Sequence, residues 1–485
     1  MRVRAERERE EKFEVARDWV LPDVGELVPK GGRITESVRR LESTYFDTRE
    51  RRLLEFGVTL RRRVGGDETG WQLKVPAGSA RTELHSKSKR PTIPKDMSGA
   101  VAGLRGDGEL LPVASVSTTR TARRVVDADG EVLFELADDD VQTTTLGEEA
   151  TVRAWREVEV ELGPAGRKKT LAKVASWLRA AGAKRSRSTT KLGRALGEDD
   201  ASADNADADE RRVENGTLGG LVLAYLGEQC EVIAWNDIAL RTGAPVVHKT
   251  RVAVRRLRST LRVFADVFDS DKAAGLDAEL VWYAGLLGAV RDCDVLEARL
   301  MEHIAALPTE YVLGPVAARV QETLALDRRA AVQALNQGMS SDRYQQLFEV
   351  VRRWRTAPPL TETATAKAQA ASSYVREARR KAEKRLDRAD GEVEQLHRAR
   401  KAIKRLRYAG ELTKPVDRHA SRVARKAKHL QTELGEHQDA VVSAAFLARL
   451  GATAGTRPGD NGFTYGILMA SELSTAERIR HSLAT

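Results

Sequence analysis

The feature that most restricts how this chain can fold is a basic segment that occurs twice. The first copy, HKTRVAVRRLRSTLR, begins at His248, and the second, HRARKAIKRLRY, begins at His397, an offset of 149 residues. Both follow the order His, basic, any, Arg, any, Ala, Val or Ile, basic, Arg, Leu, Arg. Such self-similarity predicts that the carboxy-terminal half contains a duplicated structural unit.

Both copies carry their charges at helical spacing. In the first copy one His and four Arg fall at i, i+3, i+7, i+10 and i+14, so they share one helix face. Like charges one turn apart repel each other, which favours a polyanion as their partner over a solvated Lys/Arg face. The predicted anion-binding residues are His248, Arg251, Arg255, Arg258 and Arg262 in the first copy and His397, Arg400, Lys404 and Arg407 in the second.

A second repeated element follows each basic segment. The sequence LGAVRD contains Gly288, and LGEHQD contains Gly435, an offset of 147 residues. The two elements keep nearly the same separation in both halves, which strengthens the prediction of a duplicated helical unit.

The charge balance limits the class of partner. The chain has 485 residues with a formal net charge of +10 and a pI near 9.5, which favours phosphate-bearing partners, although an anionic membrane surface would fit the same values. Aromatic residues make up 5% of the chain, and Tyr408 is the one aromatic residue in the basic segments. An RNA-binding protein that stacks bases is therefore disfavoured, and we expect no specific nucleic-acid binding.

Cysteine usage and apolar runs indicate the compartment. Cys230 and Cys293 form neither a metal-ligand spacing nor a disulfide framework, which is typical of a reducing cytoplasm. The amino terminus, MRVRAEREREEKFEV, lacks the apolar run of a signal peptide, and no stretch approaches about 18 uninterrupted apolar residues. We therefore expect a cytoplasmic protein that is neither exported by that route nor membrane-spanning.

The hydrophobic period changes once along the chain. Residues 6–196 alternate apolar and polar positions in short runs, as antiparallel strands do, with clear examples at 58–64, 71–75, 132–136 and 158–162. From residue 213 to 485 the period is helical. Residues 197–212, GEDDASADNADADERR, have too few apolar side chains to fold and are predicted to be a flexible acidic linker. The fold class is thus α+β and multidomain.

Two of the predicted strands carry acids on one face. Glu8, Glu10 and Lys12 lie at i, i+2 and i+4 and so point to the same side of a strand. Glu157, Glu159 and Glu161 repeat the pattern. Converging carboxylates hold hard divalent cations such as Mg²⁺ or Mn²⁺.

Other strands carry bases on one face. Arg61 and Arg63 lie opposite Leu60 and Val64, and Lys74 lies opposite apolar neighbours. Acidic and basic faces on one set of strands favour a closed barrel with a polar lumen over an open sheet with one solvent-exposed polar face. The outer face of such a barrel needs helices, and residues 171–178 are one candidate.

The amino-terminal half resembles the CYTH family of triphosphate tunnel metalloenzymes. The resemblance rests on EREEKF, STYFDT, LLEFGVTLRRR, GWQLKVP, FELADDDV, EVEVEL and STTKLGRAL. It implies an eight-stranded antiparallel tunnel with flanking helices that binds triphosphate and one or two divalent metals. The implied metal ligands are Glu8, Glu10, Glu157, Glu159 and Glu161, and the implied catalytic residues are Glu8, Glu10 and Lys12. The implied triphosphate-binding residues are Lys12, Arg61, Arg63, Lys74, Arg120, Arg123 and Lys191, with Glu135 and Asp139 as further lumen acids.

Two details of this resemblance stay open. EVEVEL offers three acids without showing which contact metal, and ADDD leaves the register of Asp138 and Asp139 undecided.

The carboxy-terminal half is similar to the CHAD family, through the two basic segments together with GAVRDCDV and GEHQDAVV. This resemblance implies two four-helix bundles related by a pseudo-twofold axis, whose basic helices line a groove that binds inorganic polyphosphate. The whole chain then resembles a metal-dependent hydrolase of inorganic triphosphate, or of a related polyphosphate or organic triphosphate, joined to a polyphosphate-binding domain. Association with polyphosphate granules would follow from that binding.

Two alternatives remain from the sequence. A non-catalytic polyphosphate-binding or granule-associated protein is disfavoured because a pure anion binder gains nothing from carboxylates without a metal. A nucleotidyl cyclase or a thiamine triphosphatase would use the same tunnel chemistry, and the sequence shows no base-recognition feature that separates them. The physiological substrate, the metal and the oligomeric state stay open.

Overall fold

The computed structural model describes residues 5–65, 69–77, 80–147, 150–186, 188, 190–197, 216–389, 392–456 and 459–484, with backbone alone for 5–8, 77, 80, 81, 393, 483 and 484. The chain forms two compact units: Met1–Asp209 with Asp237–Ala244, and Glu210–Asn236 with Pro245–Thr485. The predicted linker, 197–212, lies outside the described residues except for Gly197.

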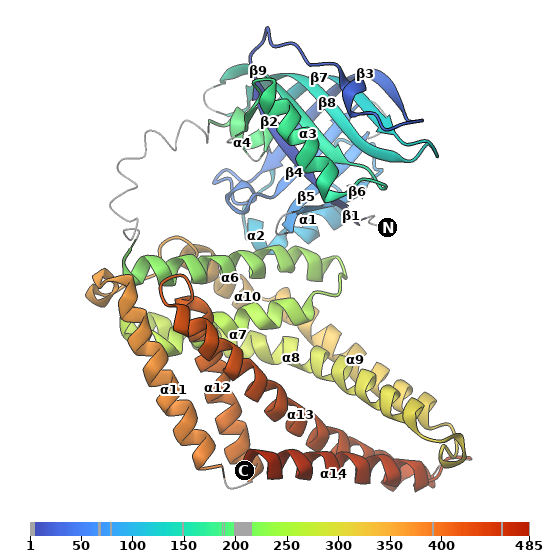
Figure 1. Cartoon of the computed structure of the whole chain (residues 1–485), viewed down its shortest axis with the longest axis vertical. Coiled ribbons are helices and arrows are strands. Elements are labelled where there is room, and N and C mark those ends of the chain that lie inside the picture. Colours follow the sequence, from blue (N-terminus) through green and yellow to red (C-terminus); the bar gives the residue numbers. More distant parts are fainter. Residues whose placement is uncertain are drawn as a thin grey trace. The chain divides into compact units, whose positions relative to one another are not determined.

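The first unit is built on one antiparallel sheet with the strand order β1-β6-β5-β4-β3-β7-β8-β9-β2-β10 (Figure 1). Its strands are β1 (Ala5–Glu8), β2 (Glu10–Val15), β3 (Arg33–Asp47), β4 (Thr59–Val64), β5 (Gly70–Ala77), β6 (Ala80–Ser86), β7 (Leu111–Val126), β8 (Val132–Thr145), β9 (Val152–Leu162) and β10 (Lys184–Arg185). The predicted strands fall within these elements, except that β4 begins at Thr59 and not at residue 58.

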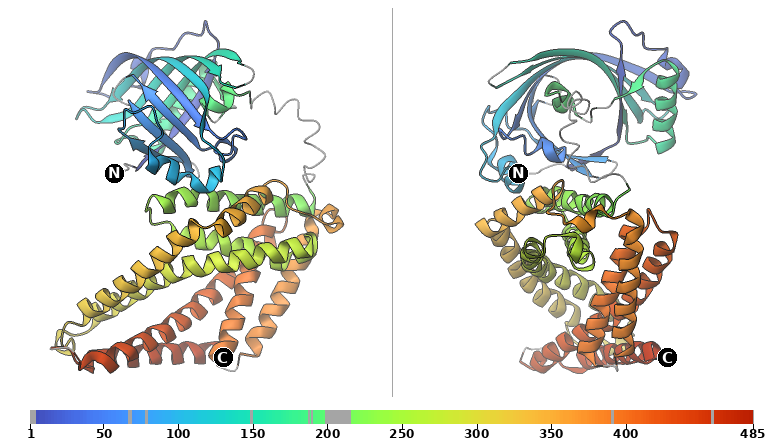
Figure 2. Two further views of the ribbon diagram at one scale, coloured as in Figure 1. Left: turned by 180° about the vertical axis from the view of Figure 1, so that it is seen from behind. Right: turned by 90° about the vertical axis from the view of Figure 1, so that its left-hand side faces the viewer.

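The sheet closes on itself through the first two strands. Only Arg9 separates β1 from β2, while β1 pairs with β6 and β2 pairs with β9. The two ends of the sheet are therefore joined by one interrupted strand, and the ring of strands is visible in the right-hand view of Figure 2. Counting β1 and β2 as one strand and leaving out the two-residue β10, the barrel has the eight strands that were predicted.

The two faces of each strand differ because alternate side chains point to opposite sides. Phe13 of β2 and Val158 of β9 are fully buried on the outer face, where Leu178 of helix α3 (Lys168–Ala180) packs in the same core. Each such side chain contributes about 1.5–3 kcal/mol when it is fully buried. The helix that covers this face contains the segment predicted for that role.

This unit also contains the short α-helices α1 (Lys95–Ala100), α2 (Ala102–Arg105) and α4 (Lys191–Ala195). The hydroxyl of Thr190 caps α4 by accepting a hydrogen bond from the Gly193 amide at 2.9 Å. Since α4 packs beside β8, this cap fixes the direction in which Lys191 enters the barrel.

The second unit is helical. Its helices are α6 (Leu218–Arg241), α7 (Val247–Val263), α8 (Ser270–Ala306), α9 (Val316–Met339), α10 (Asp342–Trp354), α11 (Ala371–Asp387), α12 (Val393–Thr413), α13 (Arg418–Ala454) and α14 (Phe463–Ala484). Both basic segments are helical, in α7 and in α12, as predicted.

The duplication is visible in the order of these helices. Helices α8 and α13 each have 37 residues, and each follows and packs against the helix that carries a basic segment. Helices α7 and α12 also pack against each other. The repeated helical unit is therefore confirmed, while the pseudo-twofold axis between the halves stays a prediction.

Among the described residues, α8 alone is long and apolar enough to cross a membrane, with a mean hydropathy of 1.2 over its most apolar window. Apolar core helices meet the same criterion, and α8 carries Asp277 and Arg299, which form ion pairs with other helices. It is weak evidence for a membrane span.

Candidate functional site

The strand register places the two acidic strands side by side in the barrel. Glu10 of β2 is the Cα partner of Glu161 of β9, and Glu161 is the partner of Glu135 of β8. Two residue pairs further along, Lys12 faces Glu159. Three carboxylates on neighbouring strands thus lie at one level of the lumen.

The lumen holds an open cavity, with about 590 Å³ of free space that includes the solvent at its mouth. Charged side chains make up most of its lining, and Tyr45 is the one aromatic residue among the described residues that line it. The acids are Glu10, Glu83, Glu159 and Glu161, and the bases are Lys12, Arg61, Arg63, Lys74, Arg120 and Lys191. The predicted charged lumen is therefore present.

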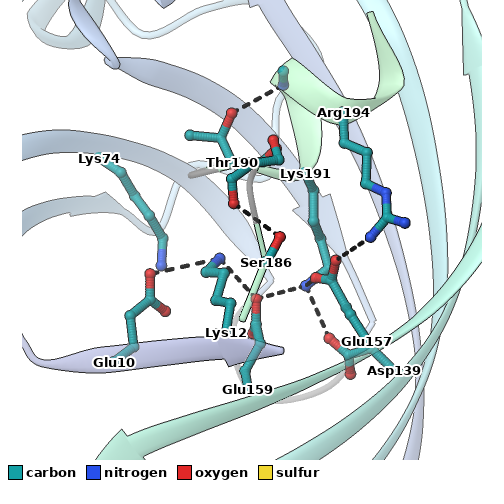
Figure 3. Close-up of polar contacts among 12 residues, drawn as sticks. Glu10, Lys12, Lys74, Asp139, Glu157, Glu159, Ser186, Thr190, Lys191 and Arg194 are labelled. Atoms are coloured by element: carbon teal, nitrogen blue, oxygen red, sulfur yellow. Dashed lines mark hydrogen bonds and ion pairs between the residues drawn. The ribbon is translucent and has the colours of Figure 1, made fainter. Parts of the chain in front are cut away.

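Glu159 is the carboxylate on which three cations converge. Its Oε1 lies 2.7 Å from Lys12 Nζ and 2.8 Å from Lys191 Nζ (Figure 3). Its Oε2 accepts a hydrogen bond from Arg120 Nη2 at 2.7 Å. Burial acts to raise the pKa of Glu159, but the charges of Lys12, Lys191 and Arg120 outweigh it and hold that pKa well below its usual range. This carboxylate is ionised at neutral pH.

Lys191 reaches from α4 into a pocket of acids. Its Nζ lies 2.6 Å from Glu157 Oε1 and 2.9 Å from Asp139 Oδ2, in addition to its contact with Glu159. Burial acts to lower the pKa of Lys191, but the three carboxylates raise it above its ordinary value. Carboxylate oxygens of this triad lie within 4.8 Å of one another, so the triad could also hold a metal ion.

The side of the barrel formed by β4 and β5 carries basic side chains that are held by hydrogen bonds and an ion pair. Arg61 donates to Gln72 Oε1 at 2.6 Å and to the Tyr45 hydroxyl at 3.0 Å. Burial acts to raise the pKa of Tyr45, yet the charges of Arg61 and Arg63 lower it overall. Lys74 Nζ lies 3.3 Å from Glu83 Oε1.

Most of the predicted tunnel residues come together in this cavity. Those that line it are Glu10, Lys12, Arg61, Arg63, Lys74, Arg120, Glu159, Glu161 and Lys191. Arg123 does not line the cavity, and its Nε pairs with Glu36 at 2.8 Å. Val125, two positions along the same strand face, belongs to the core outside the barrel. The predicted acids Glu135, Asp139 and Glu157 are also absent from the lining. The side chain of Glu8 lies outside the described residues.

The structure also separates the neighbouring aspartates of β8. Asp139 is fully buried and faces Lys191 and Arg120. Asp138 points to the other side of the strand, where Arg156 Nη2 lies 2.7 Å from it. Asp139 is therefore the lumen acid of ADDD.

Four of the described lining residues were not among the predicted site residues: Tyr45, Thr59, Glu83 and Thr190. Glu83 is 4% exposed and lies near Arg61, Lys74 and His85, at 3.9, 3.3 and 3.1 Å. The alternation of Glu83 with Leu84 was the signal that could have placed it in the lumen. Tyr45 follows from the same alternation in STYFDT, but its bond to Arg61 is a tertiary contact.

In the helical unit, the two repeated elements contact each other. A methyl group placed on Gly288 would lie 3.5 Å from Arg251 Nη2, and one on Gly435 would lie 3.4 Å from Arg400 Nη2. In each copy, an arginine of the basic helix therefore lies against the glycine of the long helix that follows it. Both copies of the repeat make the same contact.

A central basic cluster forms where α7 meets α12, and it consists of Arg251, Arg255, Arg400 and Lys404. The Nε atoms of Arg255 and Arg400 are buried and make no hydrogen bond. Burial, followed by the charges of Arg400, Arg255 and Arg251, lowers the pKa of Lys404 to about 7. Burial also lowers the pKa values of His248 and His397, and neighbouring cations add to it.

The remaining predicted residues of the stripes lie outside this cluster. Arg258 and Arg262 share Asp277, at 2.9 and 2.6 Å. Arg407 pairs with Glu411 at 2.8 Å. The predicted continuous stripes are therefore divided by acids from α8 and α12.

Family comparisons agree with this architecture. A model of the CYTH domain matches residues 6–195, and a model of the CHAD domain matches residues 224–448. Two uncharacterised proteins of Mycobacterium tuberculosis, from strains CDC 1551 and H37Rv, are each 33% identical over 500 residues, which is 98% of this chain and 94% of the relative.

Solved structures resemble parts of the chain. PptA from Streptomyces chartreusis has a TM-score of 0.47 at 22% identity and covers 56% of this chain and 98% of its own. The CHAD domain from the plant Ricinus communis has a TM-score of 0.44 at 28% identity, with 56% and 93% covered. A putative adenylate cyclase from Bacillus halodurans has a TM-score of 0.25 at 16% identity, with 39% and 97% covered.

The closed barrel with its charged lumen, the duplicated basic helices and the two matching family models lead to one assignment: this chain belongs to the proteins in which a CYTH domain, a triphosphate tunnel metalloenzyme fold, is followed by a CHAD domain.

Proposed function

We propose that the tunnel hydrolyses a phosphoanhydride bond of inorganic triphosphate, or of a closely related polyphosphate or organic triphosphate, with the help of Mg²⁺ or Mn²⁺. The observation that carries this proposal is the cavity itself, which sets six cationic side chains around four carboxylates inside a closed barrel. An anion with several phosphoryl groups needs the cations, and a divalent metal explains the carboxylates.

The carboxylates fit a hard divalent cation, which takes oxygen ligands. We assign the metal to Glu10 and Glu161, with Glu8 as a further candidate from its place in the signature strand, because Glu159 already pairs with Lys12, Lys191 and Arg120. Glu10 and Glu161 are partners across β2 and β9, and both line the cavity. A bound Mg²⁺ or Mn²⁺ would neutralise phosphoryl oxygens and lower the pKa of a coordinated water.

The triad of Asp139, Glu157 and Glu159 is the competing metal site. The ammonium of Lys191 lies within 2.9 Å of all three carboxylates, so Lys191 would have to leave before a cation could enter. Glu157 also accepts a hydrogen bond from Trp155 Nε1 at 2.6 Å. We therefore assign Asp139, Glu157 and Glu159 to holding Lys191.

The basic wall would bind the phosphates. Arg61, Arg63 and Lys74 come from neighbouring strands, and all three line the cavity. Charges that are fixed in a partly desolvated site stabilise a developing negative charge more than mobile charges in water do. Water attacks the terminal phosphorus, the anhydride P–O bond breaks, and phosphate and diphosphate leave with one proton released, so no covalent nucleophile is needed.

In the helical unit we propose that the central basic cluster is the main binding site for inorganic polyphosphate. Arg255 and Arg400 each hold a buried Nε without a hydrogen-bond partner, and such donors are costly unless a ligand satisfies them. His248 and His397 lie beside the cluster, and Arg258, Arg262 and Arg407 would extend it less strongly because acids already pair with them. Granule association and a cytoplasmic location are part of the same proposal.

The experiment that tests this function measures phosphate release by the purified chain from four substrates: tripolyphosphate, long-chain polyphosphate, thiamine triphosphate and ATP. Each substrate is offered with Mg²⁺ and with Mn²⁺. The proposal expects release from at least the inorganic triphosphate, and its loss with a chelator. Cyclic AMP formation from ATP would assign the tunnel to a cyclase, and polyphosphate binding without any turnover would support a non-catalytic protein.

A further inference from the structure

The two copies of the basic helix differ in charge near their ends. The offset of 149 residues that relates the copies carries Arg256 to Arg405 and Arg262 to Glu411. Helix α7 therefore carries an arginine where α12 carries a glutamate. Because α7 and α12 pack against each other, this difference distinguishes the two sides of their contact. The α6 side contains Arg256 and Glu411, and the α11 side contains Arg405 and Arg262.

On the α6 side the acid neutralises the arginines around it. Arg256 Nη2 lies 2.9 Å from Glu411 Oε2, and Arg407 Nε lies 2.8 Å from Glu411 Oε1. The hydroxyl of Tyr225, on α6, donates a hydrogen bond to the same carboxylate at 3.4 Å. Both oxygens of Glu411 are thus in use, and both arginines have a counter-charge.

On the α11 side one acid lies among three arginines. Asp277 of α8 contacts Arg258 through Oδ1 at 2.9 Å and Arg262 through Oδ2 at 2.6 Å. Both of its oxygens are therefore in use. Arg405 forms no hydrogen bond or ion pair with any residue that the structure describes. It lacks the counter-charge that its counterpart on the α6 side has.

Arg405 is half-buried among like charges. Burial lowers the pKa of Arg405, and the charge of Arg262 adds to this effect. Arg258 and Arg385 act in the same direction, while Asp277 acts against them. Arg385 is an exposed residue of α11, which packs against α12 (Figure 1). Since arginine stays ionised in proteins, these converging cations destabilise the site unless an anion joins them.

The guanidinium groups limit the kind of anion. Their paired N–H donors match carboxylate and phosphate oxygens. Four arginines against one aspartate leave an excess of positive charge that one further carboxylate would not neutralise. Consecutive phosphates of one chain each bring a negative charge, so a polyphosphate fits this side better than a single carboxylate.

The α11 side is continuous with the central basic cluster. Along α7, Arg262 follows Arg255 of the cluster by seven residues, which is about 10 Å at 1.5 Å per residue. Arg258 lies between them. On α12, Arg405 directly follows Lys404 of the cluster. A polyanion bound at the cluster therefore has a second set of cations within about two helical turns.

We propose that Arg258, Arg262 and Arg405 form a second anion subsite, which holds the phosphates of a polyphosphate chain beyond those bound by the central basic cluster. Arg385 lies at the edge of this subsite. The inference rests on the proposed polyphosphate binding. Because Glu411 neutralises the α6 side, the chain leaves the cluster towards α11 and not towards α6.

The test measures binding of end-labelled long-chain polyphosphate to the full chain by fluorescence anisotropy, with a chelator present and over a range of salt. Arg405→Gln should weaken binding by about tenfold or more, as expected for a lost hydrogen bond to a charged group. It should also lower the slope of log K against log salt by roughly 0.7–0.9, the value for one neutralised phosphate in nucleic acids. Arg405→Lys should keep most of the slope because it keeps the charge.

The matched control is Arg256→Gln, which makes the same change in net charge at the equivalent position of the α6 side. Its affinity and salt slope should stay close to those of the unmodified chain, because Glu411 already neutralises that arginine. Arg262→Glu gives α7 the acid of α12 and should weaken binding more than Arg405→Gln does. Thermal unfolding of each variant shows whether the fold is retained.

Equal effects of Arg405→Gln and Arg256→Gln would show that net charge governs binding and would overturn the proposal. Unchanged binding in Arg405→Gln, while charge reversal at Arg255 and Lys404 weakens it, would confine the chain to the central basic cluster. Binding that none of these variants changes would contradict the polyphosphate proposal itself. Orthophosphate that binds the unmodified chain but not Arg405→Gln, with long-chain binding unaltered, would assign the subsite to a free phosphate ion.

Discussion

The ammonium of Lys12 lies 2.7 Å from Oε1 of Glu159, its Cα partner across β2 and β9. This one contact joins the strand EREEKF to the strand EVEVEL, although about 150 residues separate them in the chain. The antiparallel register then places Glu10 against Glu161. The acidic motifs of β2 and β9 therefore contribute to one site.

Glu161→Gln and Glu157→Gln should differ in their effects. Loss of Glu161 removes a proposed metal ligand, so Mn²⁺ affinity and turnover should fall by at least about 100-fold, at the upper end of the losses seen for outer-shell partners. Loss of the Glu157 carboxylate leaves Lys191 with two acids and should lower the free energy of unfolding by about 1–3 kcal/mol, with a smaller change in Mn²⁺ affinity. Calorimetric titration of Mn²⁺ and urea unfolding measure the two quantities. The reverse pattern would move the metal to the triad around Lys191.

Glu83→Gln should raise KM for tripolyphosphate more than it lowers kcat. Glu83 lies near Arg61 and Lys74 and so holds part of the basic wall in place before substrate binds. A hydrogen bond to a charged group contributes about 1.5–3 kcal/mol, which corresponds to roughly 10- to 100-fold in KM. Steady-state kinetics separate the two constants, and an unchanged KM would mean that Glu83 does not position these cations. Glu55→Gln, an acid outside the cavity lining, is the control.

Charge reversal at Arg255 and Lys404 together should weaken polyphosphate binding and lower its salt dependence. By analogy with nucleic acids, log K falls with log salt by roughly 0.7–0.9 for each phosphate that is neutralised, so losing two cations should reduce the slope by more than one. Reversal of Arg329 and Arg478, two exposed arginines on α9 and α14, makes the same change in net charge and is the control. Equal effects of the two pairs would show that net charge, and not the cluster, governs binding.

Polyphosphate should bind more tightly as the pH falls from 8 to 6. Burial and the neighbouring Arg400, Arg255 and Arg251 lower the pKa of Lys404 to about 7, with Asp439 acting against them. Lys404 is therefore partly neutral in the free protein, and a bound anion raises its pKa again. Binding then takes up a proton above pH 7, and affinity should change by up to about tenfold per pH unit there.

Lys404→Arg separates this effect from other titrations, because arginine stays charged throughout that range. The variant should bind as tightly at pH 8 as at pH 6. Burial and neighbouring cations lower the pKa values of His248 and His397 from their ordinary value. A variant that keeps the full pH dependence would assign the proton to another group.

The sequence sufficed for the barrel and for most of its lumen because the strand period is strict. Side chains two residues apart on a strand point to the same face, so Lys12 and Glu10 share one face of β2, and Arg61 and Arg63 share one face of β4. The prediction that Arg123 lines the lumen did not follow this alternation. Arg123 is three residues from Arg120, so its side chain points to the opposite face, where it pairs with Glu36. The alternation around Arg120 was sufficient to exclude it.

Other features depended on contacts that no local pattern contains. Lys191 forms ion pairs with Asp139 and Glu157 because α4 packs against β8. The division of the basic stripe depends on Asp277 of α8, which binds Arg258 and Arg262 and lies outside the repeated motif. Helical spacing predicts which residues share a face, but it does not show which acids a neighbouring helix brings to that face.

The central claim is that Glu10 and its neighbouring carboxylates make the tunnel a metal-dependent triphosphatase. The most direct measurement is phosphate release from tripolyphosphate with Mn²⁺, comparing the unmodified chain with Glu10→Gln at matched thermal stability. The account predicts turnover that a chelator abolishes and that Glu10→Gln reduces to background while the domain stays folded. Turnover in Glu10→Gln equal to that of the unmodified chain, or activity that survives the chelator, would contradict it.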